Sequence, residues 1–326
     1  MFDFKKRIGK AQKLLAAKGI SNLIFASGME ANANVLYYTG DSTTPIVIWI
    51  TPDSSKFFGS KENQAFDECG SIEQYRELVK KLKGRKVAVD ERANGSLAFA
   101  IQKKNKVIPF WGELMKLREI KEPEEARAIQ KAQDITKKAV FSLDLWGKTE
   151  NTLAGELELA ARKRGCALNA FPPIVISEAT SAIPHGVPGN RLVRKGDMLL
   201  FDVGVRFENY CADFSHTFYE GSNKQRKDAI EAVWESQKAA MKLCKPEVLG
   251  KKVCEKALEV LKEYGFEKNS HKKIGLALGH LVGLDVHDGV KSIEHLMLKK
   301  GHVFTIEPGI YFKGDYGVRF EDIVCI

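Results

Sequence analysis

The sequence LLFDVGVRFENYCADFSHTF, residues 199–218, carries two aspartates inside an otherwise apolar strand pattern. Branched and aromatic residues surround both Asp202 and Asp213, as in the strands of a buried sheet. If these strands form a hairpin that turns near Asn209, the two Asp side chains lie opposite one another, about 5 Å apart at Cβ. Because a buried carboxylate without a partner is costly, we expect a cation beside this pair.

A second pair of acidic residues lies in VFTIEPGIYFKGDYGVRFED, residues 303–322. Glu307 and Glu321 are equally spaced from Gly314, so a hairpin centred on this glycine places their carboxylates opposite one another. Four carboxylates this close raise one another's pKa unless cations neutralise them. Together with an imidazole from GHLVGLDVHD, residues 279–288, they suit a pair of Mn²⁺, Co²⁺, Fe²⁺ or Zn²⁺ ions.

The overall composition is that of a globular protein. The chain has 326 residues, of which 44% are hydrophobic and 29% charged, and this balance excludes a disordered chain. The length suggests two domains. The net charge of +9 comes from Lys and Arg residues spread along the chain beside acidic residues, which favours a solvated surface over a nucleic-acid groove. We therefore expect no nucleic-acid partner.

Cysteine spacing and hydropathy predict a cytoplasmic protein. The six cysteines form no C-x-x-C pair and lack the dense spacing of a secreted scaffold, so we expect reduced thiols. The first residues, MFDFKKRIGKA, lack the apolar core of a signal peptide. No apolar run approaches the roughly 20 residues of a membrane span, so we expect no membrane partner.

Hydrophobic periodicity predicts two domains, which we place at residues 1–115 and 116–326. In the first, apolar strands alternate with amphipathic helices, which is typical of a smaller α/β domain. Its expected helices span 8–18 and 72–82, and its expected strands span 22–26, 45–51, 86–90 and 106–110. The second has the pattern of an α+β domain in which helices cover an antiparallel sheet. Its expected helices span 126–143, 152–164, 227–243 and 251–264, and its expected strands span 198–205, 210–218, 303–312 and 317–324.

The order and setting of five residues resemble those of the pita-bread metallopeptidases, which include prolidase, aminopeptidase P and methionine aminopeptidase. These residues are Asp202, Asp213, His280, Glu307 and Glu321, within FDVGVRFENYCADFSHTF, GHLVGLDVHD, TIEPGIYF and GVRFED. NVLYYTG, residues 34–40, and residues 117–132 resemble the prolidase and aminopeptidase P branch, and methionine aminopeptidases usually lack so large a first domain. The resemblance implies a catalytic pita-bread domain, also called the creatinase/aminopeptidase fold, after a creatinase-like amino-terminal domain.

The resemblance also implies a role for each of the five residues. Asp202 holds one metal ion, His280 holds the other, and Asp213 and Glu321 bridge both. Glu307 is both a ligand and the general base. Two divalent cations per subunit, Mn²⁺ or Co²⁺ before Zn²⁺ or Fe²⁺, then activate a hydroxide for attack on a peptide bond. Since all five positions are filled, the chain differs from metal-free relatives such as creatinase.

Two further residues acquire roles from the same resemblance, and a third acquires its role from its position in the strand. His185 and His287 occupy the positions of substrate-side imidazoles, where they bond the scissile carbonyl or the proline end and help to transfer a proton. Arg319, two residues before Glu321, is expected to orient that carboxylate.

The implied function is a prolidase, a Xaa-Pro dipeptidase that acts as a homodimer on proline-containing peptides. One alternative is a Xaa-Pro aminopeptidase on longer peptides, and another is a peptide-binding homologue without turnover. The family often has a His where this chain has Leu276, and many prolidases have an Arg where we find Lys291. A lysine cannot clamp a carboxylate with two parallel bonds, so the preference between dipeptides and longer peptides stays open.

Overall fold

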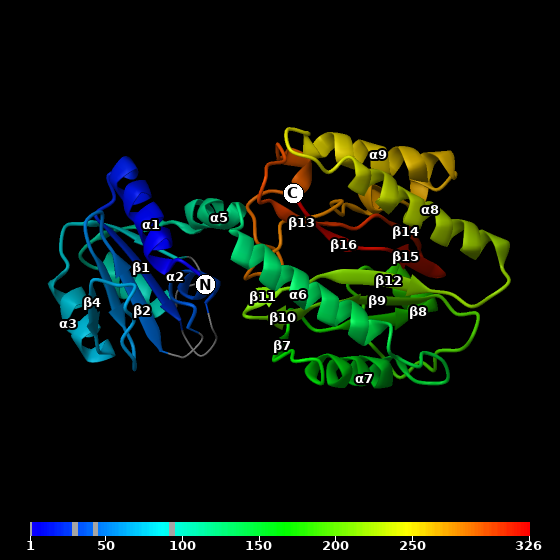
Figure 1. The fold of residues 1–326 in the computed structure, drawn as a ribbon, viewed down its shortest axis with the longest axis horizontal. Coiled ribbons are helices and arrows are strands. Elements are labelled where there is room, and N and C mark those ends of the chain that lie inside the picture. The colour runs from blue at the N-terminus through cyan, green and yellow to red at the C-terminus, as the bar shows by residue number, and fades with distance from the viewer. Residues whose placement is uncertain (1, 28–31, 42–44, 91–94) are drawn as a thin grey trace. The chain divides into compact units, whose positions relative to one another are not determined.

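The computed structural model describes residues 2–27, 32–41, 45–90 and 95–326. The chain divides into two compact units, Met1–Arg118 and Glu119–Ile326, and each is described by itself (Figure 1). The boundary that we expected after residue 115 falls inside helix α5 (Trp111–Glu119), and the division follows Arg118. Helix α5 therefore belongs almost entirely to the first unit.

The first unit is a six-stranded mixed sheet with helices, as the alternating pattern predicted. The strands follow the order β4-β3-β2-β1-β5-β6, with parallel pairs β1–β5, β5–β6 and β3–β4. The strands are β1 (Asn22–Ser27), β2 (Ile46–Ile50), β3 (Ser55–Phe58), β4 (Glu68–Gly70), β5 (Lys86–Val89) and β6 (Lys106–Pro109). The other helices are α1 (Phe4–Lys18), α2 (Ala33–Thr39), α3 (Ile72–Lys81) and α4 (Gly95–Gln102).

Local sequence accounts for these elements. Every residue of β2 is buried, as expected of a branched and aromatic run inside a sheet. Helix α1 begins after Asp3, which accepts a hydrogen bond from the Lys6 amide (3.0 Å), and ends at Gly19, whose φ of 61° suits glycine. The sequence analysis missed α2, β3, β4, α4 and α5, because such short runs carry little periodicity. The short strands that it did predict, β1, β2, β5 and β6, all contain Ile or Val, whereas β3 and β4 contain neither.

The second unit places antiparallel strands between helices. In Figure 1 its strands lie between α7 on one side and α8 and α9 on the other. The helices are α6 (Pro123–Val140), α7 (Glu150–Arg162), α8 (Lys224–Lys242) and α9 (Gly250–Glu263), with 3₁₀ turns η1 (Glu178–Ala182), η2 (Glu267–Asn269), η3 (His271–Ile274) and η4 (Ile293–His295). The strands are β7 (Leu168–Asn169), β8 (Ile174–Ser177), β9 (Leu199–Val203), β10 (Val205–Phe207), β11 (Tyr210–Cys211), β12 (Phe214–Phe218), β13 (Val303–Ile306), β14 (Gly309–Phe312), β15 (Tyr316–Arg319) and β16 (Asp322–Cys325).

Within residues 119–326, every strand pair is antiparallel, as predicted. The strands are divided among four small sheets, β11-β10-β7, β12-β9-β8, β13-β16 and β14-β15. Helix α6 has Pro123 in its first turn and packs Ile135 and Ala139 into a core shared with α7 and β9. None of the helices described combines the length and apolar character needed to cross a lipid bilayer.

The register of the first acidic hairpin differs from the prediction by two residues. Strands β9 and β12 pair so that Asp202 lies opposite Ser215 rather than Asp213. The turn consists of Glu208 and Asn209, which both have positive φ (49° and 70°), and our prediction centred it one residue earlier. Because a two-residue shift preserves the face, Asp202 and Asp213 still point to the same side.

The second acidic hairpin has the predicted register. Strands β13 and β16 pair symmetrically about Gly314, and so do β14 and β15. Gly314 has a φ of 81°, a conformation that favours glycine. Glu307 lies in the break between β13 and β14, and Glu321 lies in the matching break between β15 and β16. Both carboxylates therefore occur where the ladder is interrupted.

Candidate metal centre

The five predicted ligand residues line a single cavity of about 340 Å³ in the second unit. Asp202 comes from β9, Asp213 directly precedes β12, and His280 comes from the segment after η3. Glu307 and Glu321 enter from the two strand breaks described above. The hairpins and one loop thus place four carboxylates and an imidazole around a common space.

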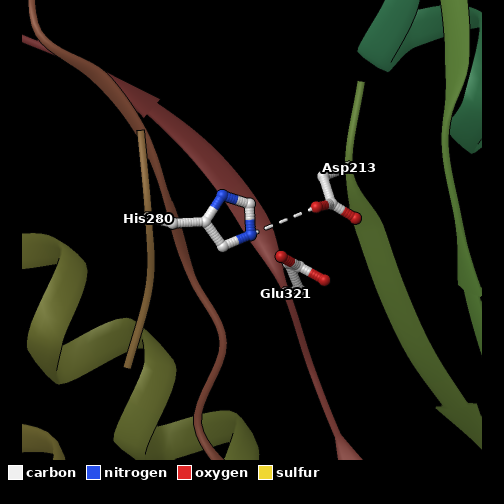
Figure 2. Close-up of side chains that lie close together, drawn as sticks. All are labelled: Asp213, His280 and Glu321. Carbon is white, nitrogen blue, oxygen red and sulfur yellow. Dashed lines mark ion pairs between the residues drawn. The ribbon is translucent and has the colours of Figure 1, made fainter. Parts of the chain in front are cut away.

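His280 lies close to two of its acidic neighbours. Its Nε2 atom lies 3.4 Å from Asp213 Oδ2 and 3.5 Å from Glu307 Oε1. One ligand atom from each of Asp213, His280 and Glu321 lies within 4.8 Å of the others. Figure 2 shows these three side chains pointing toward one another from separate segments. The Nδ1 atom of His280 lies 3.3 Å from the Leu281 carbonyl, which fits an imidazole that offers Nε2 to a metal.

Two buried carboxylate oxygens in the cavity have no hydrogen-bond partner. They are Oδ1 of Asp202 and Oε1 of Glu321. The second oxygen of each is occupied, because Arg319 donates to Asp202 Oδ2 and the Ser215 hydroxyl donates to Glu321 Oε2 (2.7 Å). A buried anionic oxygen without a donor is unfavourable, so both free oxygens are suited to bind a cation.

The electrostatics of the cluster also favour a bound cation. Burial, followed by repulsion from Asp202 and Glu307, raises the pKa of Asp213 well above its usual range. Burial, followed by repulsion from Asp213 and Glu307, does the same to the pKa of Glu321. Divalent cations would stabilise the ionised forms of both groups. The donor set therefore fits the metal ions that the sequence predicted.

Arg319 contacts a different carboxylate from the one that we expected. Its guanidinium donates to Asp202 Oδ2, to Ser215 Oγ (2.9 Å) and to Tyr311 Oη (2.9 Å). It reaches Glu321 only through Ser215, whose hydroxyl bonds that carboxylate. We expected Arg319 to orient Glu321, and the link between them is indirect because Arg319 lies in β15, whereas Glu321 lies in the break that follows the strand.

His185 and His287 both line the cavity and are both exposed. The rings of His287 and His280 meet edge to face, with their centroids 4.0 Å apart. Partial burial, together with the neighbouring imidazoles of His280 and His185, lowers the pKa of His287 to about 4. An imidazole that is neutral near pH 7 can both accept and donate a hydrogen bond.

Part of the cavity wall is apolar, and the sequence analysis missed it. Its residues are Phe171, Pro172, Pro173, Ile174, Val187, Pro188 and Val286. The available signal was the sequence FPPI, residues 171–174, which ends at the first residue of β8. Two prolines beside bulky apolar residues do not suit the centre of a strand, so this run indicates an apolar surface outside the sheet. Lys291 is exposed and Leu276 is half-buried, and neither lines the cavity.

Thr305 and Ser215 are further residues that the pattern did not reveal. The Thr305 hydroxyl donates to Glu307 Oε1 (3.2 Å) and accepts from the His280 amide (3.1 Å). Ser215 joins Arg319 to Glu321 in the same way. Both hydroxyls are buried and fix the rotamers of carboxylates in the cavity.

Comparison with known proteins gives consistent matches over the whole chain. Residues 126–326 match the sequence profile of metallopeptidase family M24. The chain is 32% identical over 325 residues to a Xaa-Pro dipeptidase of Pyrococcus horikoshii, covering 94% of this chain and 91% of that protein. The solved prolidase of Pyrococcus furiosus has a TM-score of 0.86 at 29% identity and covers 97% of this chain and 96% of its own. The X-Pro aminopeptidase of Thermotoga maritima has a TM-score of 0.83 at 30% identity and covers 98% and 94%.

Proposed function

The chain belongs to metallopeptidase family M24, and we propose that it hydrolyses the peptide bond that precedes proline, as a Xaa-Pro dipeptidase. The observation that carries the proposal is that four carboxylates and one imidazole converge on one cavity with an apolar wall. Relatives named Xaa-Pro dipeptidase and prolidase, aligned over nearly the whole chain, support the same activity.

We propose that the cavity binds two divalent cations, Mn²⁺ or Co²⁺ before Zn²⁺ or Fe²⁺. Asp202, Asp213, His280, Glu307 and Glu321 would hold these ions. If all four carboxylates are ionised, the Arg319 guanidinium balances only one of them, so three negative charges remain for bound cations to neutralise. When bound, such ions lower the pKa of a water and polarise the substrate carbonyl.

Glu307 serves as the general base for the attacking water. Thr305 donates to Oε1 of Glu307 (3.2 Å), which leaves Oε2 to accept the proton. The same hydroxyl accepts from the His280 amide, so Thr305 fixes the positions of the base and the ligand histidine relative to each other. The proton then passes to the proline nitrogen, which leaves as a secondary amine.

His185 and His287 act on the substrate side of the cavity. Both are exposed at its lining and can donate a ring N–H to the scissile carbonyl or to the proline end. His287 also contacts the ring of His280, which places it beside the acidic cluster. We assign to this pair the orientation of the scissile bond and part of the proton transfer to the leaving nitrogen.

The apolar wall suits a proline ring. A peptide nitrogen of proline carries no N–H, so a peptidase for Xaa-Pro bonds cannot hold its substrate through that donor. Phe171, Pro172, Val187 and Val286 instead offer apolar contact to the pyrrolidine ring. Recognition of proline here therefore depends on shape and on burial of apolar surface.

Cleavage of longer peptides with proline in second position is the second candidate. Within residues 119–326, no Lys or Arg lines the cavity, so the described wall offers no cation to the carboxylate of a dipeptide. This observation favours substrates whose chain continues beyond proline.

A peptide-binding role without turnover is disfavoured, because all five ligand positions are filled. We further propose a cytoplasmic homodimer, which light scattering after gel filtration would test.

The test compares Ala-Pro and Leu-Pro with a Xaa-Pro-Xaa tripeptide, with and without Mn²⁺ or Co²⁺. We expect cleavage to require the metal ion and to occur only at the bond before proline. We expect Glu307→Gln to lose most of this activity. Glu294→Gln is the matched control, because Glu294 pairs with Lys272 (3.0 Å) and does not line the cavity. Equal activity of Glu307→Gln and the wild type would refute the assigned base. Cleavage of the tripeptide alone would favour the second candidate.

A further inference from the structure

A buried carboxylate outside the cavity joins both ends of the segment that forms one of its walls. The carboxylate belongs to Glu150, which is 1% exposed and opens helix α7. Its Oε1 accepts from the Ser177 amide (2.7 Å) and hydroxyl (2.5 Å), and its Oε2 accepts from the Gly189 amide (2.9 Å). Residues 177–189 are thereby closed into a loop, and this loop carries His185.

The first half of the loop has several other attachments. Glu178 has a φ of 53°, which is strained for a residue other than glycine, and Arg226 holds its carboxylate with two bonds (2.5 and 2.7 Å). The Ser181 hydroxyl accepts from the Gly317 amide (2.8 Å). The Pro184 carbonyl accepts from Arg319 (3.2 Å), the residue that also bonds Asp202. The backbone is therefore fixed up to the residue before His185.

The second half of the loop has far fewer attachments. The four residues after Pro184, at positions 185–188, all line the cavity. Val187 is 81% exposed, and the only backbone bond in this stretch joins Gly186 to Ile183 inside the loop (2.9 Å). The next attachment outside the loop is at Gly189, whose amide bonds Glu150 and whose carbonyl accepts from the Asn151 amide (3.0 Å). The start of α7 therefore holds the end of the loop at Gly189.

We propose that Glu150 is a positioning residue for His185 and for the cavity wall at residues 185–188, an inference that rests on the proposed function. A carboxylate suits this place because each of its oxygens meets an N–H donor. Glutamine offers only one acceptor oxygen, so Glu150→Gln turns an amide NH₂ toward either Ser177 or Gly189. One end of the loop is then released, while the helix and the cavity ligands are unchanged.

The first test is a double-mutant cycle between Glu150→Gln and His185→Ala. In the wild-type background, we expect Glu150→Gln to lower kcat/KM for the better Xaa-Pro substrate by about tenfold to 100-fold. In the His185→Ala background the same change should lower kcat/KM by a clearly smaller factor, because His185 is already gone and only the wall at residues 186–188 is left to position. Equal losses in both backgrounds would overturn the proposal, since a general loss of structure acts in both.

The matched control is Glu125→Gln. Glu125 is also 1% exposed and also lies in the first turn of a helix, where it bonds Tyr210 (3.0 Å) and the Glu122 amide (2.8 Å), outside residues 177–189. Whatever activity Glu125→Gln loses, it should lose equally with and without His185. If Glu150→Gln does not fold, Ser177→Ala replaces it, because this change removes one donor and keeps the carboxylate.

The second test is hydrogen exchange without substrate, which does not depend on activity. Glu150→Gln should speed exchange of the hydrogen-bonded amides of Gly186 and Gly189, and Glu125→Gln should not. Unchanged exchange in Glu150→Gln would overturn the positioning role even if the enzyme is active. If the wild type hydrolyses no Xaa-Pro substrate but the exchange result holds, the proposed function fails while the attachment of the loop by Glu150 stands.

Discussion

Chelation of the metal ions should make the protein less stable, and increasingly so as the pH rises. Burial and mutual repulsion raise the pKa of Asp213 and of Glu321 in the metal-free fold. The unfolded chain releases the same protons near pH 4. Above that pH, and up to the raised values, the folded state binds more protons than the unfolded state. The free energy of unfolding therefore falls with rising pH, by about 1.4 kcal/mol per pH unit for each retained proton.

The expected effect is large compared with the stability of a domain. Each of the two carboxylates that keeps its proton in the fold makes the free energy of unfolding fall by about 1.4 kcal/mol per pH unit. For a domain of this size, a loss of about 1.4 kcal/mol lowers Tm by about 3 to 6 °C. Metal-loaded protein should lack this slope, because the cations stabilise both carboxylates in their ionised form.

The assay is thermal unfolding of chelated and metal-loaded protein across this pH range. The control is the chelated double variant Asp213→Asn/Glu321→Gln. It has no titrating carboxyl group at these two positions, so it should lose little stability as the pH rises. A chelated wild type whose Tm stays constant or increases from pH 5 to pH 7 would refute the reasoning, because the acidic cluster would then be tolerated without cations.

Three further predictions concern other contacts. Gly279→Ala should weaken metal binding at least tenfold in a titration, because a Cβ at this position would lie 1.9 Å from the Thr305 carbonyl oxygen beside His280. Lys121→Met should lower the free energy of unfolding by about 3 to 5 kcal/mol in denaturant titrations, since it removes one partner of the buried pair with Asp288 (3.0 Å); an unchanged midpoint would contradict this. Burial lowers the pKa of His271 to about 4. Below pH 6.5 the unfolded chain therefore binds a proton at this histidine that the folded chain does not, and the free energy of unfolding falls between pH 6.5 and about pH 4. His271→Asn should reduce this fall by about 3 kcal/mol in acid unfolding curves.

The acidic residues of the centre could be predicted because a strand has a fixed period. Charged side chains inside apolar runs are conspicuous, and antiparallel pairing converts their spacing into proximity. This reasoning gave the right register for the hairpin about Gly314. For the first hairpin it failed by two residues, because the Glu208-Asn209 turn uses positive φ at both positions and the midpoint of two aspartates carries no information on turn type.

Contacts between segments far apart in the sequence could not be predicted in this way. Arg319 was expected beside Glu321 from sequence distance alone, yet its guanidinium reaches Asp202, which β9 brings across from another hairpin. The apolar wall was missed for the same reason, since its residues come from three separate segments of the chain. A pattern in one strand indicates which face a side chain occupies, but the partner on that face depends on how the sheets pack.

The same distinction explains why a residue such as Glu150 has no signature in the sequence. It stands in the first turn of a helix, where an acidic residue is favoured by the helix dipole alone, and this local reason would be sufficient. Only the packing of α7 against the loop turns the carboxylate inward, where it meets amides at both ends of residues 177–189. Exposed glutamates in other first turns, such as Glu73 of α3, satisfy the same local preference, and the hydrogen bonds of Glu73 stay within the start of its own helix. Burial of the carboxylate, and the donors that it meets, therefore separate a helix-capping residue from one that positions a cavity wall.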